Sequence, residues 1–217
     1  MENDEKYLNS THYCDFNDPE LQKLAGRFKG KAKNENEFVK VIFEYVRDEF
    51  PFGVDLVKVK ASETAKKGYG SCWSKSLLLI ALLRYHQIPA RLIRYPMKRD
   101  FQLFVGLFYI FMNNPFYHCA VEVFIENRWI KIDPTIDARL YNALYKPLNV
   151  KWDIQWDGKN DCVNCPDKML GGPELFDNID GIINANVGNL ITPVFLPFYY
   201  IVNALAWKKI KRRLMVS

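Results

Sequence analysis

The sequence predicts an α+β domain in which helices come first and an antiparallel sheet follows. The first half of the chain carries two amphipathic helical patterns, and seven consecutive apolar residues at 77–83 indicate a third helix that is buried on most sides. Alternating segments separated by turn signals then follow. Helices followed by strands are typical of the α+β class. The 217 residues, 49% of them hydrophobic, suffice for one domain with a full core, alone or with an appendage.

The two amphipathic helices open the chain. Asp18 is a good capping residue and Pro19 suits the first helical position, so a helix is expected from there to about residue 28. Apolar residues at helical spacing predict a second helix over 37–50. Pro51 ends it, because proline cannot continue a helix.

The third helix is the most apolar element of the chain, and Cys72 lies at its start. Residues 54–70 are expected to form a loop that leads to it. Gly68 and Gly70 allow a sharp turn there and keep bulk away from the sulfur. The helix is expected to stop before Pro89.

Strands are predicted in the second half. Residues 90–95 and the strictly alternating segment 150–156 both read as strands, the latter followed by an Asp157-Gly158 turn. The aromatic stretch 101–112 is too short to cross a bilayer and is expected to pack beside a cleft or in the core.

A hairpin is predicted around a turn at Asn127-Arg128. That register places Glu122 opposite Asp133 and puts both on the same face as His118. His118 then lies four residues beyond Glu122, about 13 Å along an ideal strand. Contact between His118 and Asp133 therefore needs a bulge, a wider turn or strong coiling, and Glu122 is the alternative partner for the imidazole.

Charge and cysteine content narrow the class of protein. The net charge of +5 comes from the five Lys and Arg residues at 208–213, so a generally basic nucleic-acid surface is not indicated. Five cysteines at uneven spacings do not form the pattern of a secreted disulfide framework, and residues 1–16 lack an apolar signal segment. We expect a cytoplasmic protein.

Three residues carry candidate chemistry. A helix N-terminus favours thiolate over thiol, which makes Cys72 a candidate nucleophile. Of the three histidines, His12 lies in a polar segment and His86 at a helix end, whereas His118 begins a strand after a loop. With Asp133 closing the next strand, the order is nucleophile, base and orienting acid.

These residues resemble a known family. The segments 68–91 and 118–135 are similar to the core of the transglutaminase-like superfamily, with Gln87 standing where members commonly have glycine. The resemblance implies a papain-like fold, in which a central nucleophile-bearing helix packs on an antiparallel sheet. It also implies that Cys72 is the nucleophile, His118 the base and Asp133 the orienting acid. The expected catalytic domain is 1–180, with its core motifs at 61–137.

The implied reaction is acyl transfer through a thioester on Cys72, with a peptide or protein amide as substrate and no cofactor. The backbone N–H of Cys72 is the first candidate oxyanion donor, and Trp73 or an upstream side chain is the candidate for the second. Water as acceptor makes a peptidase or amidase, which we favour, and an amine makes a transamidase. An inactive domain that only binds peptides is a further alternative.

Two remaining features have alternative interpretations. Cys162 and Cys165 form a C-x-x-C pair that could bind zinc only if His12 and Cys14 joined them. Two free thiols or a labile redox pair, without a metal, are favoured. Residues 181–217 run from an uncharged stretch into basic residues. A helical extension packed on the domain is favoured, and contact with a membrane surface is the alternative.

Overall fold

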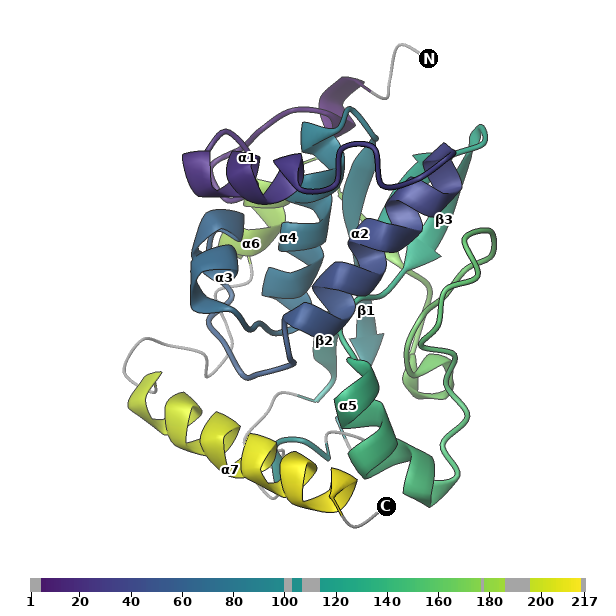
Figure 1. Ribbon diagram of the computed structural model, residues 1–217. Coiled ribbons are helices and arrows are strands. Elements are labelled where there is room, and N and C mark those ends of the chain that lie inside the picture. Colours follow the sequence, from purple (N-terminus) through teal and green to yellow (C-terminus); the bar gives the residue numbers. More distant parts are fainter. Residues whose placement is uncertain (1–4, 100–102, 107–113, 177, 186–195, 216–217) are drawn as a thin grey trace.

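The computed structural model describes residues 5–99, 103–106, 114–176, 178–185 and 196–215. These residues form helices and a four-stranded antiparallel sheet with strand order β3-β2-β1-β4 (Figure 1), which confirms the predicted α+β class. The helices are α1 (Pro19–Gly26), α2 (Glu35–Glu49), α3 (Ala61–Lys67), α4 (Cys72–Tyr85), α5 (Ala138–Leu140), α6 (Ile179–Ala185) and α7 (Leu196–Leu214). The strands are β1 (Ala90–Met97), β2 (Phe116–Ile125), β3 (Arg128–Ile132) and β4 (Glu174–Leu175). Short helical turns are η1 (Glu5–Tyr7), η3 (Tyr141–Tyr145), η4 (Lys146–Leu148) and η5 (Pro166–Lys168).

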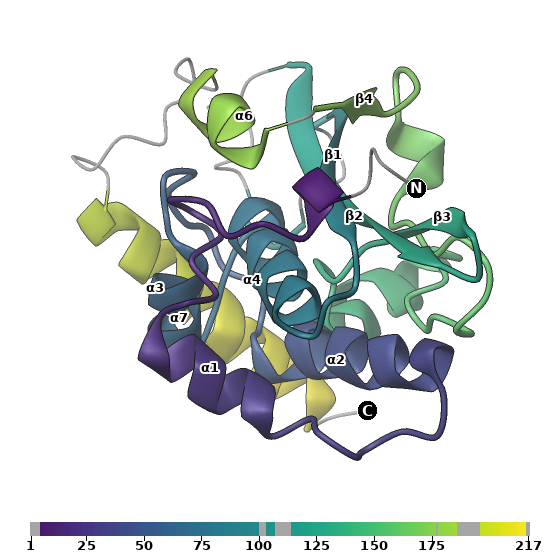
Figure 2. The ribbon, with the colours of Figure 1, turned by 90° about the horizontal axis from the view of Figure 1, so that it is seen from above.

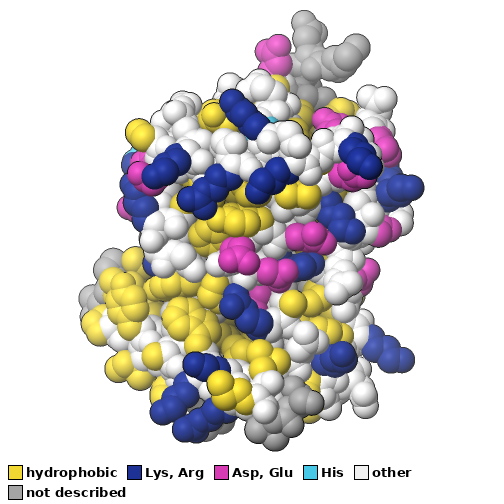
Figure 3. Space-filling model, viewed as in Figure 1, with side chains coloured by type: hydrophobic (Ala, Val, Ile, Leu, Met, Phe, Trp, Pro, Cys, Tyr) yellow, Lys and Arg dark blue, Asp and Glu magenta, His cyan; other side chains and the backbone are white. Residues whose placement is uncertain are grey.

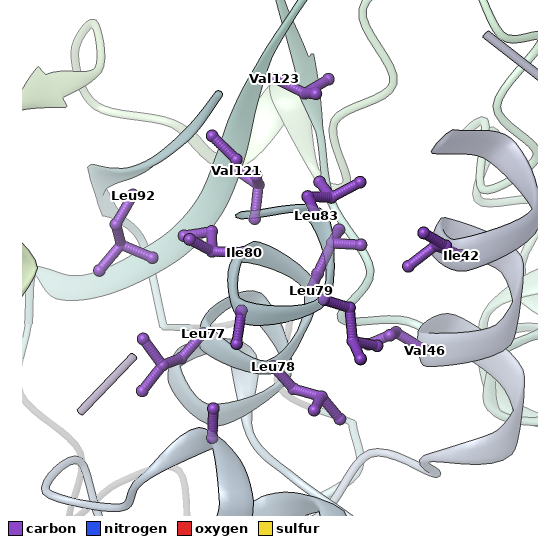
Figure 4. Packing of buried hydrophobic residues seen from close by; sticks show 14 of the residues in the cluster. Ile42, Val46, Leu77, Leu78, Leu79, Ile80, Leu83, Leu92, Val121 and Val123 are labelled. Carbon is purple, nitrogen blue, oxygen red and sulfur yellow. The ribbon is translucent and has the colours of Figure 1, made fainter. Parts of the chain in front are cut away.

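Helix α4 is the centre of the molecule. It packs against β1 and β2 on one side and against α1, α2 and α3 on the other (Figure 2). Its apolar side chains point in every direction, toward Val121 on the sheet and toward Ile42 and Val46 on α2 (Figure 4). This position explains why residues 77–83 are apolar throughout: both flanking layers exclude water from the helix.

Capping residues define the first two helices. The Asp18 side chain accepts a hydrogen bond from the backbone N–H of Glu20 at 2.9 Å, as expected for the predicted start of α1. Helix α2 begins at Glu35, two residues earlier than predicted. The reason is that Asn34 caps it by accepting the N–H of Glu37 at 2.9 Å.

The expectation of a loop throughout 54–70 is wrong, because α3 forms within it. This helix has few apolar residues, so its sequence lacks a strong periodic signal. Contacts from elsewhere hold it: Asp15 accepts hydrogen bonds from the Ser62 N–H at 3.0 Å and from the Ser62 hydroxyl at 2.6 Å. Gly68 ends it in the left-handed conformation, with φ of 77°.

The hairpin has a different register from the predicted one. Ile125 pairs with Arg128, so the turn residues are Glu126 and Asn127, both with positive φ (51° and 60°). A two-residue turn with left-handed residues at both positions matches the twist of the strands, and asparagine favours it. Relative to the predicted register, each residue of β2 pairs with a residue of β3 two positions earlier in the sequence. A shift of two residues keeps every side chain on its predicted face of the sheet.

Residues 150–156 do not form the predicted strand, but the predicted burial of their alternating apolar side chains is largely confirmed. Trp152, Ile154 and Trp156 are all buried. Side chains rather than a neighbouring strand satisfy the carbonyl groups of this segment: the Arg47 guanidinium donates to the Ile154 carbonyl at 2.7 Å. The fourth strand is instead β4, which pairs with β1. After the predicted turn, Asp157 accepts the N–H of residues 159 and 160.

A second apolar cluster extends the core away from α4. It joins Ile93 and Ala120 of the sheet to α5, η3 and α7. Most of the aromatic stretch 101–112 lies outside the described residues; within it, Phe104 and Val105 are buried in this cluster. Helix α7 contributes Ala206 to the cluster and lies along the edge of the molecule (Figure 1).

Candidate active site

Cys72 is the first residue of α4, as predicted. Ser71 precedes it as the capping residue, and the Ser71 N–H donates to the Ser74 hydroxyl at 2.9 Å. Gly70 has no room for a side chain, because a Cβ there would lie 2.5 Å from Ser74 Oγ and 3.1 Å from Lys75 Cγ. Because Cys72 is the first residue of α4, its sulfur lies at the end of the helix where the backbone N–H groups have no intrahelical partner.

His118 and Asp133 are in contact. His118 Nε2 lies 2.6 Å from Asp133 Oδ2, and both side chains are buried. Extending the observed hairpin register by one residue places Asp133 opposite Ala120, only two residues from His118. The separation along the strand is then about 7 Å rather than about 13 Å, which the side chains bridge.

The pKa shifts of His118 and Asp133 favour an imidazolium paired with a carboxylate. Burial alone would lower the pKa of His118, but the charge and hydrogen bond of Asp133, together with contact with the Cys72 sulfur, raise it to about 10. Burial alone would raise the pKa of Asp133, and His118 lowers it below its usual value. Because His118 Nε2 is hydrogen-bonded to Asp133, Nδ1 is the ring nitrogen that can interact with the Cys72 sulfur.

Further contacts hold Asp133, and sequence reasoning did not identify them. Its Oδ1 accepts the Thr135 N–H at 2.9 Å, and its Oδ2 also accepts the Asn164 N–H at 3.3 Å. The Asn164 side-chain amide donates to the Asp133 carbonyl at 3.3 Å. Asn164 is 1% exposed, and its Oδ1 has no hydrogen-bond partner among the described residues.

Asn164 reaches the site because its segment runs beside β3. The Cys162 N–H donates to the Lys131 carbonyl at 2.8 Å, and the Asp133 N–H donates to the Cys162 carbonyl at 2.9 Å. Two backbone bonds thus extend the sheet edge by a short stretch of chain. No periodic pattern marks so short a pairing, so the sequence carried no signal for Asn164.

Lys75 lies one helical turn beyond Cys72 and is fully buried. Its ammonium donates to the carbonyls of Arg47 at 2.9 Å and Thr135 at 3.1 Å. Burial lowers its pKa to about 8, although Asp137, Asp48 and Asp133 act in the opposite direction. The lysine links the end of α2 to the turn that follows Asp133, and its charge balances the acidic groups around it.

Two other predicted site residues have different surroundings. Glu122 pairs with Arg91, whose Nε donates to Oε2 at 2.7 Å, so the alternative partner for His118 is bound elsewhere. The Trp73 side chain is buried in the main core cluster. Its backbone N–H lies in the first turn of α4, next to that of Cys72.

The zinc alternative is wrong. All four residues lie in the described part of the chain, where no group of three or more His, Cys, Asp or Glu side chains could hold a metal ion. His12 and Cys14 lie near Asp180, whereas Cys162 and Cys165 lie beside β3. All five cysteines are free thiols.

Comparison with known proteins agrees with this fold. The model of the transglutaminase-like superfamily core matches residues 22–134, more than half of the chain, so the chain belongs to this superfamily. The structure is similar to a solved structure from Cytophaga hutchinsonii described as a candidate cysteine protease, with 26% identity and a TM-score of 0.50. That match covers 62% of this chain and 43% of the other.

A second solved structure, red sea bream transglutaminase, matches with 16% identity and a TM-score of 0.38. It covers 76% of this chain and 28% of the other. The chain therefore spans less than half the length of either structure. No curated protein matches the sequence.

Proposed function

We propose that this protein is a thiol enzyme that acts on amide bonds through a thioester on Cys72. The observation that carries the proposal is the buried His118–Asp133 pair, 2.6 Å apart, in contact with a cysteine at a helix N-terminus. A cysteine, an imidazole and an orienting carboxylate in this arrangement are the parts that acyl transfer requires.

The first half of the reaction forms the thioester. The Cys72 thiolate, paired with the His118 imidazolium, attacks the amide carbonyl carbon. The carbonyl oxygen becomes an oxyanion, which the backbone N–H groups at the start of α4 stabilise. His118 then donates its proton to the leaving amine, the C–N bond breaks and the acyl group remains on sulfur. Asp133 keeps the ring oriented while its charge changes.

The acceptor decides which class of enzyme results. In hydrolysis His118 takes a proton from water, the hydroxide attacks the thioester, and thiolate and carboxylic acid are released. An amine following the same path gives a transamidase. We favour water, and the similarity to the candidate cysteine protease supports this choice. The complete set of three groups argues against a domain that only binds peptides.

A single incubation separates the three alternatives. The protein is mixed with a reduced, unfolded casein and a fluorescent primary amine, and the products are analysed by mass spectrometry. New peptide N-termini or released ammonia without amine incorporation indicate hydrolysis, and incorporated amine indicates transamidation. We expect hydrolysis, lost by at least about a thousandfold in Cys72→Ala.

The matched control is Cys14→Ala, which removes a buried thiol near Asp180, away from the site, and should retain activity. Turnover that survives in Cys72→Ala would overturn the nucleophile assignment. Capture of casein peptides by the wild type with neither product would show a binding domain and would overturn the enzymatic proposal.

A further inference from the structure

Helix α7 has two faces with different environments. Its inner face packs on the domain: Tyr199, Asn203, Ala206 and Ile210 are buried. Its outer face is exposed, although the side chains along the first half of the helix are apolar. Six of the nine large apolar side chains exposed in the described residues lie on α7 or directly after it: Phe198, Tyr200, Ile201, Leu205, Leu214 and Met215.

A line of residues along the outer face changes from apolar to basic. Ile201, Leu205, Lys208 and Arg212 follow one another at intervals of four, three and four, so they share one side of the helix. Ile201 and Leu205 are 57% and 64% exposed, and both basic residues are exposed as well. An apolar stretch of this kind at the surface of a folded domain indicates an interaction site.

The basic end of α7 carries the charge imbalance of the whole chain. The five Lys and Arg residues at 208–213 equal the net charge of +5, and α7 contains no acidic residue. In the described part of the chain, none of Lys208, Lys209, Lys211 and Arg212 forms an ion pair. The charges are therefore available to an anionic partner.

Helix α7 is also accessible to a flat surface. Figure 1 shows α7 along the lower edge of the molecule, and in Figure 2, seen from above, it lies behind α3 and α2. In Figure 3 apolar side chains gather over this region with Lys and Arg side chains beside them. None of the helices in the described residues is long and apolar enough to cross a membrane. The helix would lie in the interface rather than span it.

We propose that the outer face of α7 docks on an anionic lipid bilayer. Ile201 and Leu205 enter the boundary between headgroups and acyl chains, and Lys208, Lys211 and Arg212 meet lipid phosphates and carboxylates at its surface. A bilayer supplies an apolar layer and an anionic layer in one plane, which matches the change of character along this face. The proposal is independent of the chemistry at Cys72.

The test is co-sedimentation of the full chain with vesicles of phosphatidylcholine, with and without phosphatidylserine, at physiological ionic strength. We expect binding to the anionic vesicles, at least about tenfold weaker without phosphatidylserine. Ile201→Asp/Leu205→Asp and Lys208→Glu/Arg212→Glu should each weaken binding by about tenfold or more.

Two control variants make the same chemical changes elsewhere. Lys23→Glu/Arg27→Glu alters the net charge equally at α1, and Leu170→Asp/Leu175→Asp converts two exposed leucines outside α7. Both should bind like the wild type, and circular dichroism confirms that all four variants are folded. Failure of the wild type to bind any vesicle would overturn the proposal. Wild-type binding by the Ile201→Asp/Leu205→Asp variant or by the Lys208→Glu/Arg212→Glu variant would also overturn it. Loss in the charge variant alone would indicate non-specific adsorption and would also overturn it.

Discussion

At the scale of single residues, the five thiols of this chain differ in environment. Cys72 is 8% exposed, whereas the other four are at most 3% exposed. Burial is the largest cause that raises the pKa of Cys14 and Cys162 to about 12, and it raises the pKa values of Cys119 and Cys165 well above the usual value. Thiolate is the reactive form, so these four cysteines are protected from alkylation.

We therefore predict that iodoacetamide at near-neutral pH modifies Cys72 first, by at least about tenfold in rate over any other cysteine. His118→Ala should slow the reaction because it removes the partner of the thiolate. Intact-mass measurement gives the rate, and peptide mapping identifies the residue. Preferential modification of Cys162 or Cys165 would contradict this prediction.

The His118–Asp133 pair makes a pH-dependent contribution to stability. A histidine with a raised pKa stays protonated in the folded chain while the unfolded chain loses the proton above about pH 6.5, so the unfolded state binds fewer protons. The contribution is complete below about pH 6.5 and is lost as the pH rises toward about 10. At acid pH it is lost again as Asp133 is protonated, below its usual pKa.

We predict that the difference in free energy of unfolding between wild type and His118→Gln shrinks by about 1.4 kcal/mol per pH unit between pH 7 and 9. Urea unfolding at several pH values measures it. The control is His12→Gln, an exposed histidine outside the site, for which we expect no such trend. A difference that grows with pH would refute the ion pair.

At the scale of elements, the start of α4 combines a turn, a cap and the nucleophile within three residues. Gly70 leaves the space that Ser74 Oγ occupies, and this hydroxyl accepts the Ser71 N–H. Lys75 then joins α4 to the turn beyond β3. The position of Cys72 relative to His118 therefore depends on close packing at the end of one helix.

Gly70→Ala should destabilise the fold by about 1–3 kcal/mol and reduce turnover, because the new methyl group displaces the Ser74 hydroxyl from the cap. Gly26→Ala is the matched control: no atom lies within 4 Å of its Cβ, and we expect no loss of stability. Thermal unfolding compares the two. Equal stability of both variants would show that Ser74 can move without cost.

At the scale of the whole molecule, α7 at the end of the chain binds the loop at residues 52–54, which in turn contacts the residues just before α4. Asn203 donates to the Val54 carbonyl at 3.0 Å and accepts the Val54 N–H at 2.7 Å, and Trp207 donates to the Phe52 carbonyl at 2.9 Å. This loop is in turn bonded to Gly70, whose carbonyl accepts the Gly53 N–H at 2.9 Å. Residues more than a hundred positions apart thus support the segment before Cys72.

Asn203→Ala should cost about 1–3 kcal/mol, because it leaves the N–H and C=O of Val54 without a partner. Denaturant unfolding measures the loss. Lys209→Ala, an exposed change on the same helix, should have an effect within about 0.5 kcal/mol. If both variants unfold alike, α7 does not hold this loop.

Local patterns determined much of the molecule. The α+β order, the buried helix behind Cys72 and the common face of His118 and Asp133 all follow from periodicity, which depends only on backbone geometry. The order of the three site residues and their resemblance to a family were likewise visible in the sequence alone. The hairpin turn lies one residue earlier than predicted, which shifts the strand pairing by two residues and leaves each side chain on its face, because strand periodicity is two.

Tertiary structure alone decided the contacts that complete the site. The 2.6 Å approach of His118 to Asp133 depends on a turn with left-handed Glu126 and Asn127, and the setting of Asn164 depends on pairing between distant segments. Helix α3 and the irregular segment at 150–156 are held by side chains from elsewhere in the chain. Such contacts leave no local pattern, because the groups that satisfy them lie far away in sequence and meet only in the folded state.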